Sequence, residues 1–285
     1  MAKGLRVAML QGTASATSGP LQARNSIATN LQTLIRDLQR RKARGRRGLA
    51  IVEGVRLIEE ALAAGLPITG ALVSPDLART ARGSSLRTEL EQKSVLVQDV
   101  SSRIFAALAD TDTPQGIMAI IEPRRWTAED LSVDRGGIVL VIDGVQDPGN
   151  AGTLLRTAHA LGAAGTIVLR GTADILNPKT LRAAMGATFR HPIVPMDDGA
   201  FITWTRRHDV TLWATAADGV PLPKVPRANA GHAIAVIVGN EGAGIRPALN
   251  AVAAQRVAIP LAAGADSLNV AVAAGILLHE VLRGR

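Results

Sequence analysis

A run of five apolar residues, followed at once by a glycine-bearing loop and a helix, constrains the fold of this chain more than any other feature. The run, Ile138 to Ile142, is rich in β-branched residues and predicts a strand buried on both faces. The loop contains Asp143-Gly144 and Asp147-Pro148-Gly149, and Asn150 is expected to cap the helix that follows. Because that helix is predicted to stop at Gly162, the segment has the strand, loop and helix order of a ligand-binding crevice in an open α/β sheet.

This loop lacks the signatures of the two commonest nucleotide sites. A nicotinamide site needs GxGxxG, but residues 147–152 read DPGNAG, and the phosphate loop GxxxxGK[ST] occurs nowhere in the chain. A Rossmann-type oxidoreductase is therefore a distant alternative, which a nicotinamide titration would test.

The charge of the chain favours a polyanionic partner. Its 285 residues carry a formal net charge of +8, and only 2% of them are aromatic. A cationic surface gains affinity for nucleic acid by releasing counterions from phosphates. With so few rings to stack on bases, arginine must make most of the contacts to RNA.

The sequence gives no sign of a metal, a disulfide or a membrane segment. It has no cysteine, and its five histidines show no HxxxH or related spacing, so no metal is expected. No apolar run approaches the roughly 20 residues that a bilayer requires, and no signal-peptide pattern opens the chain. A cytoplasmic protein is expected.

Alternating helix and strand patterns predict two α/β units. Residues 1–22 are expected to be a flexible arm, 23–123 the first unit, 124–136 a linker and 137–285 the second unit. In the first unit, helices are predicted at 27–38, 55–64, 85–92 and 101–109, and strands at 49–52, 68–74, 95–97 and 117–121. In the second, helices are predicted from 150 and from 177 and at 201–207 and 269–282, and strands at 138–142, 165–169, 191–194, 211–214, 233–239 and 256–259.

A strongly basic run follows the first predicted helix. Six of the eight residues in RRKARGRR are cationic: Arg40, Arg41, Lys42, Arg44, Arg46 and Arg47. They could simply complement the macrodipole at a solvated helix end. Contact with RNA phosphates is the favoured interpretation for all six.

Three separated stretches contain the polar residues expected to carry chemistry. Asn150 and Arg156 lie six apart, so both can border the crevice, although a lone helix arginine is usually just exposed. The predicted strand 233–239 is followed by glycines on both sides of Asn240 and Glu241. A tight turn without a function would account for the glycines, but not for the carboxylate of Glu241. Ser267 and Asn269 open an oily last helix, where capping is the simplest role for either.

Together these stretches resemble the TrmH (SpoU) branch of the SPOUT superfamily of RNA 2′-O-ribose methyltransferases. The matching segments are DPGNAGTLLRTA at 147–158, IVGNEGAGI at 237–245 and IPLAAGADSLNVAVA at 259–273. RRKARGRRGLAIVEGVRLIEEAL and DTPQGIMAII resemble the L30e-like substrate-binding domain often fused ahead of that catalytic domain. The two similarities cover about residues 25–285, and the one departure is Leu261, where methionine is frequent.

The resemblance implies a fold and a ligand that residue patterns alone do not. It implies a parallel-sheet α/β domain with a carboxy-terminal trefoil knot, preceded by the smaller L30e-like α/β domain. It also implies S-adenosylmethionine as cofactor, contacted largely through backbone groups. The cofactor-binding residues carried over by motif position are Gly239, Asn240, Ile259 and Leu268.

The resemblance further implies methyl transfer to a ribose 2′-hydroxyl, with Arg156 acting on the hydroxyl. The supporting catalytic residues would be Asn150, Glu241, Ser267 and Asn269. Because a guanidinium is a poor base, we expect Arg156 to hold the neighbouring phosphate and polarise the hydroxyl. By family analogy the substrate is 23S ribosomal RNA and the protein a homodimer; a tRNA methyltransferase and a non-catalytic RNA-binding protein are the alternatives.

Overall fold

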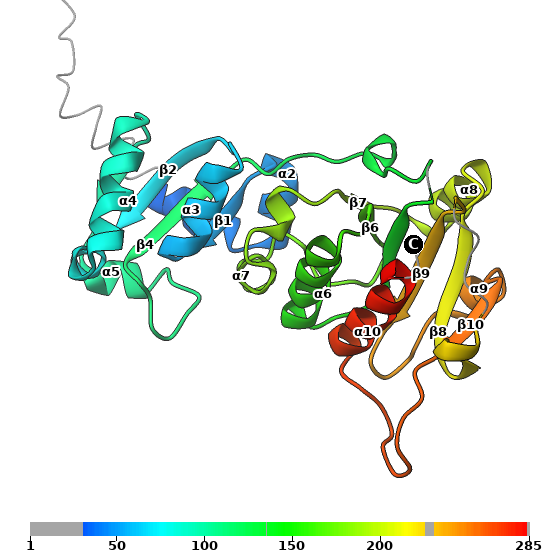
Figure 1. Cartoon of the computed structure of the whole chain (residues 1–285). Coiled ribbons are helices and arrows are strands. Elements are labelled where there is room, and N and C mark those ends of the chain that lie inside the picture. The colour runs from blue at the N-terminus through cyan, green and yellow to red at the C-terminus, as the bar shows by residue number, and fades with distance from the viewer. Residues whose placement is uncertain (1–30, 135, 226–230, 284–285) are drawn as a thin grey trace, which may run out of the picture.

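The chain folds into two α/β units, each built around one β-sheet (Figure 1). The structure is a computed structural model that describes residues 31–134, 136–225 and 231–283. The predicted arm at 1–22 and the start of the helix predicted at 27–38 lie outside the described residues, whereas 31–38 are helical.

The first unit is a four-stranded mixed sheet covered on both faces. Its elements are α2 (Arg41–Arg47), β1 (Ala50–Glu53), α3 (Val55–Ala63), β2 (Ile68–Val73), the 3-10 helix η1 (Pro75–Arg79), α4 (Ala81–Gln92), β3 (Val97–Asp99), α5 (Ser102–Ala106) and β4 (Ile117–Ile121). The strand order is β1-β4-β2-β3, with β4 antiparallel to both neighbours. Alternate residues of β4 enter opposite cores: Ile117 packs with α3 and α4, and Met118 with 31–38 and α5. Burial on both faces explains why these strands are continuous apolar runs.

The second unit is a six-stranded parallel sheet. Its helices are η2 (Ala128–Asp130), α6 (Pro148–Leu161), α7 (Pro178–Ala184), η3 (Ala187–Phe189), α8 (Asp198–Arg207), η4 (Leu222–Lys224), α9 (Pro247–Asn250) and α10 (Val270–Arg283). Its strands are β5 (Ile138–Asp143), β6 (Gly165–Val168), β7 (Ile193–Pro195), β8 (Thr211–Pro221), β9 (Ile234–Gly239) and β10 (Gln255–Ala258), in the order β10-β8-β9-β5-β6-β7. The predicted parallel-sheet α/β class is confirmed, and the trefoil knot stays a prediction.

Strand β5 is at the centre of this sheet, as the apolar run from Ile138 to Ile142 predicts. Leu140 and Ile142 pack in a core with α6 and α10, while Val139 and Val141 pack in the opposite core with α8. Parallel strands bring their carboxyl ends to one edge, where loops from β5, β8, β9 and β10 can meet.

Several predicted boundaries are wrong for local reasons. Asp147, not Asn150, caps α6: its Oδ1 accepts from the Asn150 N–H at 2.7 Å, which leaves the Asn150 side chain free for other contacts. Helix α4 begins at Ala81 rather than 85 because the Thr80 hydroxyl caps it by accepting from Gly83 N. Strand β8 continues to Pro221, beyond the predicted 211–214, because it also pairs with β10.

Part of the predicted linker at 124–136 packs against the second sheet, and the two units touch each other directly. Leu131 and Val133 are buried in the core that contains β5 and β6. Leu181 and Phe189 of the second unit enter the core of the first, and Arg190 Nη1 lies 2.7 Å from Glu60 Oε2.

The helices that the structure describes include none that is both long and apolar enough to cross a membrane.

A buried histidine beneath β6 predicts a pH-dependent stability. His191 is 2% exposed, and its Nε2 lies 2.8 Å from Thr166 Oγ1. Burial, and secondly the charge of His159, lower the pKa of His191 from 6.5 to about 4. His191 therefore binds a proton more readily in the unfolded chain than in the folded one. Its contribution to the free energy of unfolding is fully present above about pH 6.5 and is lost as the pH falls towards 4.

Urea unfolding is therefore expected to show that the free energy of unfolding falls by about 2 kcal/mol between pH 7 and pH 5. In His191→Gln, which keeps a hydrogen-bonding group beside Thr166, this loss should nearly vanish. An equal loss in the variant would assign the pH dependence to another group.

Candidate active site

Two loops at the carboxyl edge of the second sheet border a cavity of about 420 Å³. One follows β9, and the other connects β10 to α10. Seven of the nine residues predicted for cofactor binding or catalysis line this cavity: Gly239, Asn240, Glu241, Ile259, Ser267, Leu268 and Asn269. The motifs that suggested the site therefore do converge in space.

Hydrogen bonds between three side chains tie these loops to α6. Asn150 Nδ2 donates to Glu241 Oε1 at 2.7 Å, and Asn269 Nδ2 donates to Asn150 Oδ1 at 2.9 Å. Asn269 Oδ1 in turn accepts from the Ala271 N–H at 2.9 Å at the start of α10. Asn269 therefore caps the start of α10 and also belongs to the polar cluster. The side-chain amide of Asn150 binds Glu241 and Asn269, which lie 91 and 119 positions further along the chain.

The loop after β9 is held in a single compact shape. Asn240 Oδ1 accepts from the N–H groups of Gly242 and Ala243, both at 2.9 Å, and its Nδ2 donates to Gly144 O at 3.0 Å. A Cβ on Gly239 would lie 2.4 Å from the Gly244 carbonyl carbon, closer than side chains approach backbone. The side chain of Asn240 is therefore occupied in shaping the loop, and Gly239 exposes its backbone to the cavity.

A buried ion pair supports this loop from behind. Asp143, at the end of β5, is 1% exposed and accepts from Arg246 N at 2.9 Å and from Arg246 Nε at 2.6 Å. Burial alone would lower the pKa of Arg246, but the hydrogen bond and charge of Asp143 raise it, so the guanidinium stays charged. The sequence suggested only a turn at Asp143, because its partner lies 103 residues away.

Other lining residues were also missed. Thr215, Ala216 and Ala217 border the cavity because β8 extends further than predicted, and Val257 and Leu277 contribute apolar surface. None of them carries a distinctive sequence signal.

Arg156 lies on α6 and does not line the cavity itself. Its side chain is exposed and makes no hydrogen bond or ion pair with any residue that the structure describes. Gly152, between Asn150 and Arg156, serves packing: a Cβ there would lie 2.4 Å from Thr180 O on α7. Arg156 is thus a free cation on the helix whose first turn contacts Glu241.

The basic run divides into exposed cations and one buried arginine. Arg40, Arg41, Lys42, Arg46 and Arg47 are exposed. Arg44 is 3% exposed: its Nε lies 3.0 Å from Asp174 Oδ2, and its Nη1 donates to Leu38 O and Gln39 O at 2.8 Å. The prediction that Arg44 contacts RNA is wrong, because one face of α2 packs on the second unit.

Within the described ranges, no three His, Asp or Glu residues are grouped to hold a metal ion.

Comparisons with known proteins agree with this arrangement. Residues 137–279 match the SpoU rRNA Methylase family, and residues 33–119 match the MRM3-like substrate binding domain. The chain is 38% identical over 248 residues, which are 87% of it and 93% of its relative, to 23S rRNA (guanosine(2553)-2′-O)-methyltransferase RlmP of Bacillus subtilis.

Two solved structures share the fold over most of the chain. An AdoMet-bound rRNA methyltransferase from Sinorhizobium meliloti has a TM-score of 0.77 and 32% identity, covering 89% of this chain and 94% of that one. The SpoU methyltransferase AviRb from Streptomyces viridochromogenes, in complex with AdoMet, also has a TM-score of 0.77, with 27% identity and coverage of 91% and 97%. From its sequence match, its fold and its converging loops, the chain belongs to the SpoU rRNA methylase family.

Proposed function

We propose that this protein transfers the methyl group of S-adenosylmethionine to a ribose 2′-hydroxyl of 23S ribosomal RNA, in the cytoplasm. The observation that carries the proposal is the hydrogen-bonded cluster of Glu241, Asn150 and Asn269, which joins the cavity loops to the helix that presents Arg156. A protein that only bound RNA would have no use for a small-molecule cavity joined in this way to a free arginine.

The cavity fits the cofactor in size and in chemistry. Its volume of about 420 Å³ is within the usual range for small-ligand sites. Val238, Val257 and Leu277 offer apolar surface for a purine, and Gly239 leaves backbone groups accessible. In this proposal Gly239, Ile259 and Leu268 hold the cofactor through their backbones. When bound, S-adenosylmethionine supplies an electrophilic methyl group on a sulfonium.

Arg156 would position the nucleophile. Its guanidinium keeps its proton at neutral pH, so it does not act as a base, but its fork of donors suits a phosphate and an adjacent hydroxyl. The Asn150–Glu241–Asn269 cluster would fix the helix that carries Arg156 relative to the cavity, and Ser267 would orient the ribose. The hydroxyl proton would then leave to the RNA phosphate or to water.

The preference for 23S ribosomal RNA is supported by the relative RlmP, whose name states that substrate, and by the match to a substrate-binding domain at 33–119. Incubation with labelled methyl donor and separate pools of unmodified rRNA and tRNA tests it. We expect label on one ribose of 23S rRNA. Label on tRNA alone would overturn the choice of substrate, and binding of RNA without any transfer would overturn the enzymatic assignment.

We also propose a homodimer formed through α10. Val272 and Ile276 on this helix are 52% and 39% exposed, and Leu268 just before it is 38% exposed. Covering such apolar side chains is favourable. Light scattering at micromolar concentration should give twice the monomer mass for the wild type. The Val272→Glu variant should give a mass close to that of a single monomer. A monomeric wild type would contradict the proposal.

The divided basic run predicts opposite effects for two arginines. Arg40→Gln should leave stability unchanged and weaken RNA binding, because Arg40 is exposed. Arg44→Met should lower the free energy of unfolding by about 3 kcal/mol, because it removes the partner of Asp174, while RNA affinity of the folded protein is retained. Urea unfolding and filter binding of both variants measure the two effects. A stable Arg44→Met protein with weakened RNA binding would show that Arg44 contacts RNA after all.

A further inference from the structure

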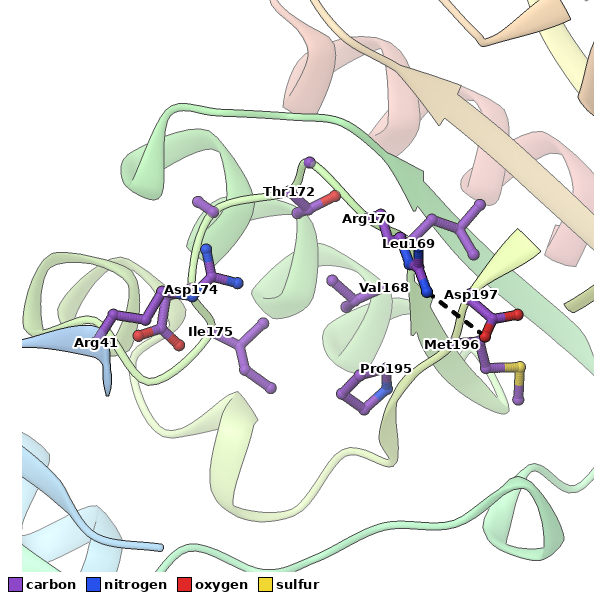
Figure 2. A pocket seen from close by; sticks show the side chains of 12 residues that line it. Arg41, Val168, Leu169, Arg170, Thr172, Asp174, Ile175, Pro195, Met196 and Asp197 are labelled. Atoms are coloured by element: carbon purple, nitrogen blue, oxygen red, sulfur yellow. Dashed lines mark ion pairs between the residues drawn. The ribbon is translucent and has the colours of Figure 1, made fainter. Parts of the chain in front are cut away.

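A second cavity of about 420 Å³ lies where the second unit meets α2 (Figure 2). It is at the carboxyl ends of β6 and β7, on the other side of β5 from the candidate active site. Its lining residues are Arg41, residues 168–175 and Pro195 to Asp197. We call it the Arg41–Arg170 groove.

The groove has a cation at each end and an apolar floor. Figure 2 shows Arg41 at one end, Arg170 at the other, and the side chains of Val168, Ile175 and Pro195 between them. Arg41 makes no hydrogen bond or ion pair with the residues that the structure describes. Arg170 is 76% exposed, and its only described partner is Asp197 at 3.8 Å, a surface pair that contributes little.

Both carboxylates of the groove already have partners. Asp174 accepts from Arg44 Nε at 3.0 Å and from Leu176 N at 3.0 Å. Asp197 caps α8 by accepting from Ala200 N at 2.8 Å. Neither is free to bind a cation, so the groove suits a ligand with negative groups at its ends and an apolar body between them, which describes a nucleotide within an RNA strand.

The wall of the groove is bonded directly to the loop that leads to Asn150. The buried Thr172 hydroxyl donates to Ile142 O and accepts from Gly144 N, both at 3.1 Å. Ala173 N donates to Val145 O at 2.8 Å. Only β5 separates β6 from β9, and neighbouring strands lie about 4.8 Å apart, so strands that supply the two cavities are about 10 Å apart. An RNA strand whose ribose lies beside the first cavity can therefore continue into the groove.

We propose that the Arg41–Arg170 groove holds a nucleotide next to the methylated one, with its base on the apolar floor and its flanking phosphates on Arg41 and Arg170. This inference rests on the proposed function and adds to it a site of strand recognition built from both units. Arg41 and Arg170 are RNA-binding residues in this proposal, because they contact the strand and not the reacting atoms.

The test compares Arg41→Gln, Arg170→Gln and the double variant with Arg103→Gln. Arg103 is an exposed arginine on α5 that lines neither cavity, and its substitution removes the same single charge as each single groove variant. With an in vitro transcript of 23S rRNA, each single groove variant should raise the RNA Kd about tenfold and lower the slope of the log association constant against log salt by roughly 0.7 to 0.9, and the double variant should lower that slope by about twice as much. The Kd for S-adenosylmethionine and the kcat at saturating RNA should match those of Arg103→Gln.

Failure of this inference can be told apart from failure of the proposed function. If wild-type protein methylates the transcript and all three single variants bind it alike, with equal salt slopes, the groove does not hold the RNA. If the groove variants lose kcat at saturating RNA and keep wild-type RNA affinity, the groove does not bind the strand and the inference is also wrong. If wild-type protein transfers no methyl group to any RNA, the proposed function itself fails.

Discussion

Arg156→Lys is expected to lower the methylation rate at saturating RNA and methyl donor by about 100-fold, since loss of positioning at a reacting group has effects of this size. Lysine keeps the charge but loses the planar fork of donors that can engage a phosphate and a hydroxyl together. Arg156 is exposed and has no partner among the described residues, so the free energy of unfolding should change by less than about 0.5 kcal/mol.

Arg206→Lys is the matched control for this variant, because Arg206 is an exposed arginine on α8, outside the candidate active site. Single-turnover rates of the two variants separate the chemical step from product release. If Arg156→Lys keeps activity within a few-fold of Arg206→Lys, bidentate positioning by Arg156 is the wrong explanation.

Gly239→Ala is expected to weaken binding of S-adenosylmethionine by about 100-fold, equivalent to about 3 kcal/mol. The added methyl group would lie 2.4 to 2.5 Å from backbone atoms of Gly244 and Ile245, so the loop after β9 would have to move away from the cavity. Calorimetric titration of the folded variant measures the loss.

Gly242→Ala is the matched control within the same loop. A Cβ there has Asn240 Oδ1 as its nearest neighbour, at 3.7 Å, which is an ordinary contact. Its affinity for the donor should stay close to that of the wild type. Equal affinities in the two variants would show that this loop does not hold the cofactor.

The sequence predicted those parts of the fold that depend on local patterns. The apolar runs at Ile138 and Ile234 became neighbouring buried strands, and the glycine-bearing segments after them became loops at one sheet edge. The motifs also pointed to Glu241 and Asn269, which line the cavity. Polar residues are conspicuous in a sequence when they lie between glycines or at the start of an apolar helix.

What the sequence did not predict depends on contacts between distant residues. Asp143 looked like part of a turn until Arg246, 103 residues later, was seen to bind it. Arg44 looked like its exposed neighbours, yet Asp174 lies 130 residues away and holds it in the interface between the units. Charge and local period carry no information on such partners, and the same limit applies to the groove between Arg41 and Arg170.

The two cavities predict that the methyl donor and the RNA meet across the loop between β5 and α6. A crystal structure with S-adenosylhomocysteine and an RNA oligonucleotide that spans the modified position tests this most directly. We expect the nucleoside of S-adenosylhomocysteine among Gly239, Ile259 and Leu268, with a ribose 2′-oxygen of the RNA within hydrogen-bonding distance of Arg156. Ligand bound elsewhere, or a ribose far from Arg156, would contradict this prediction.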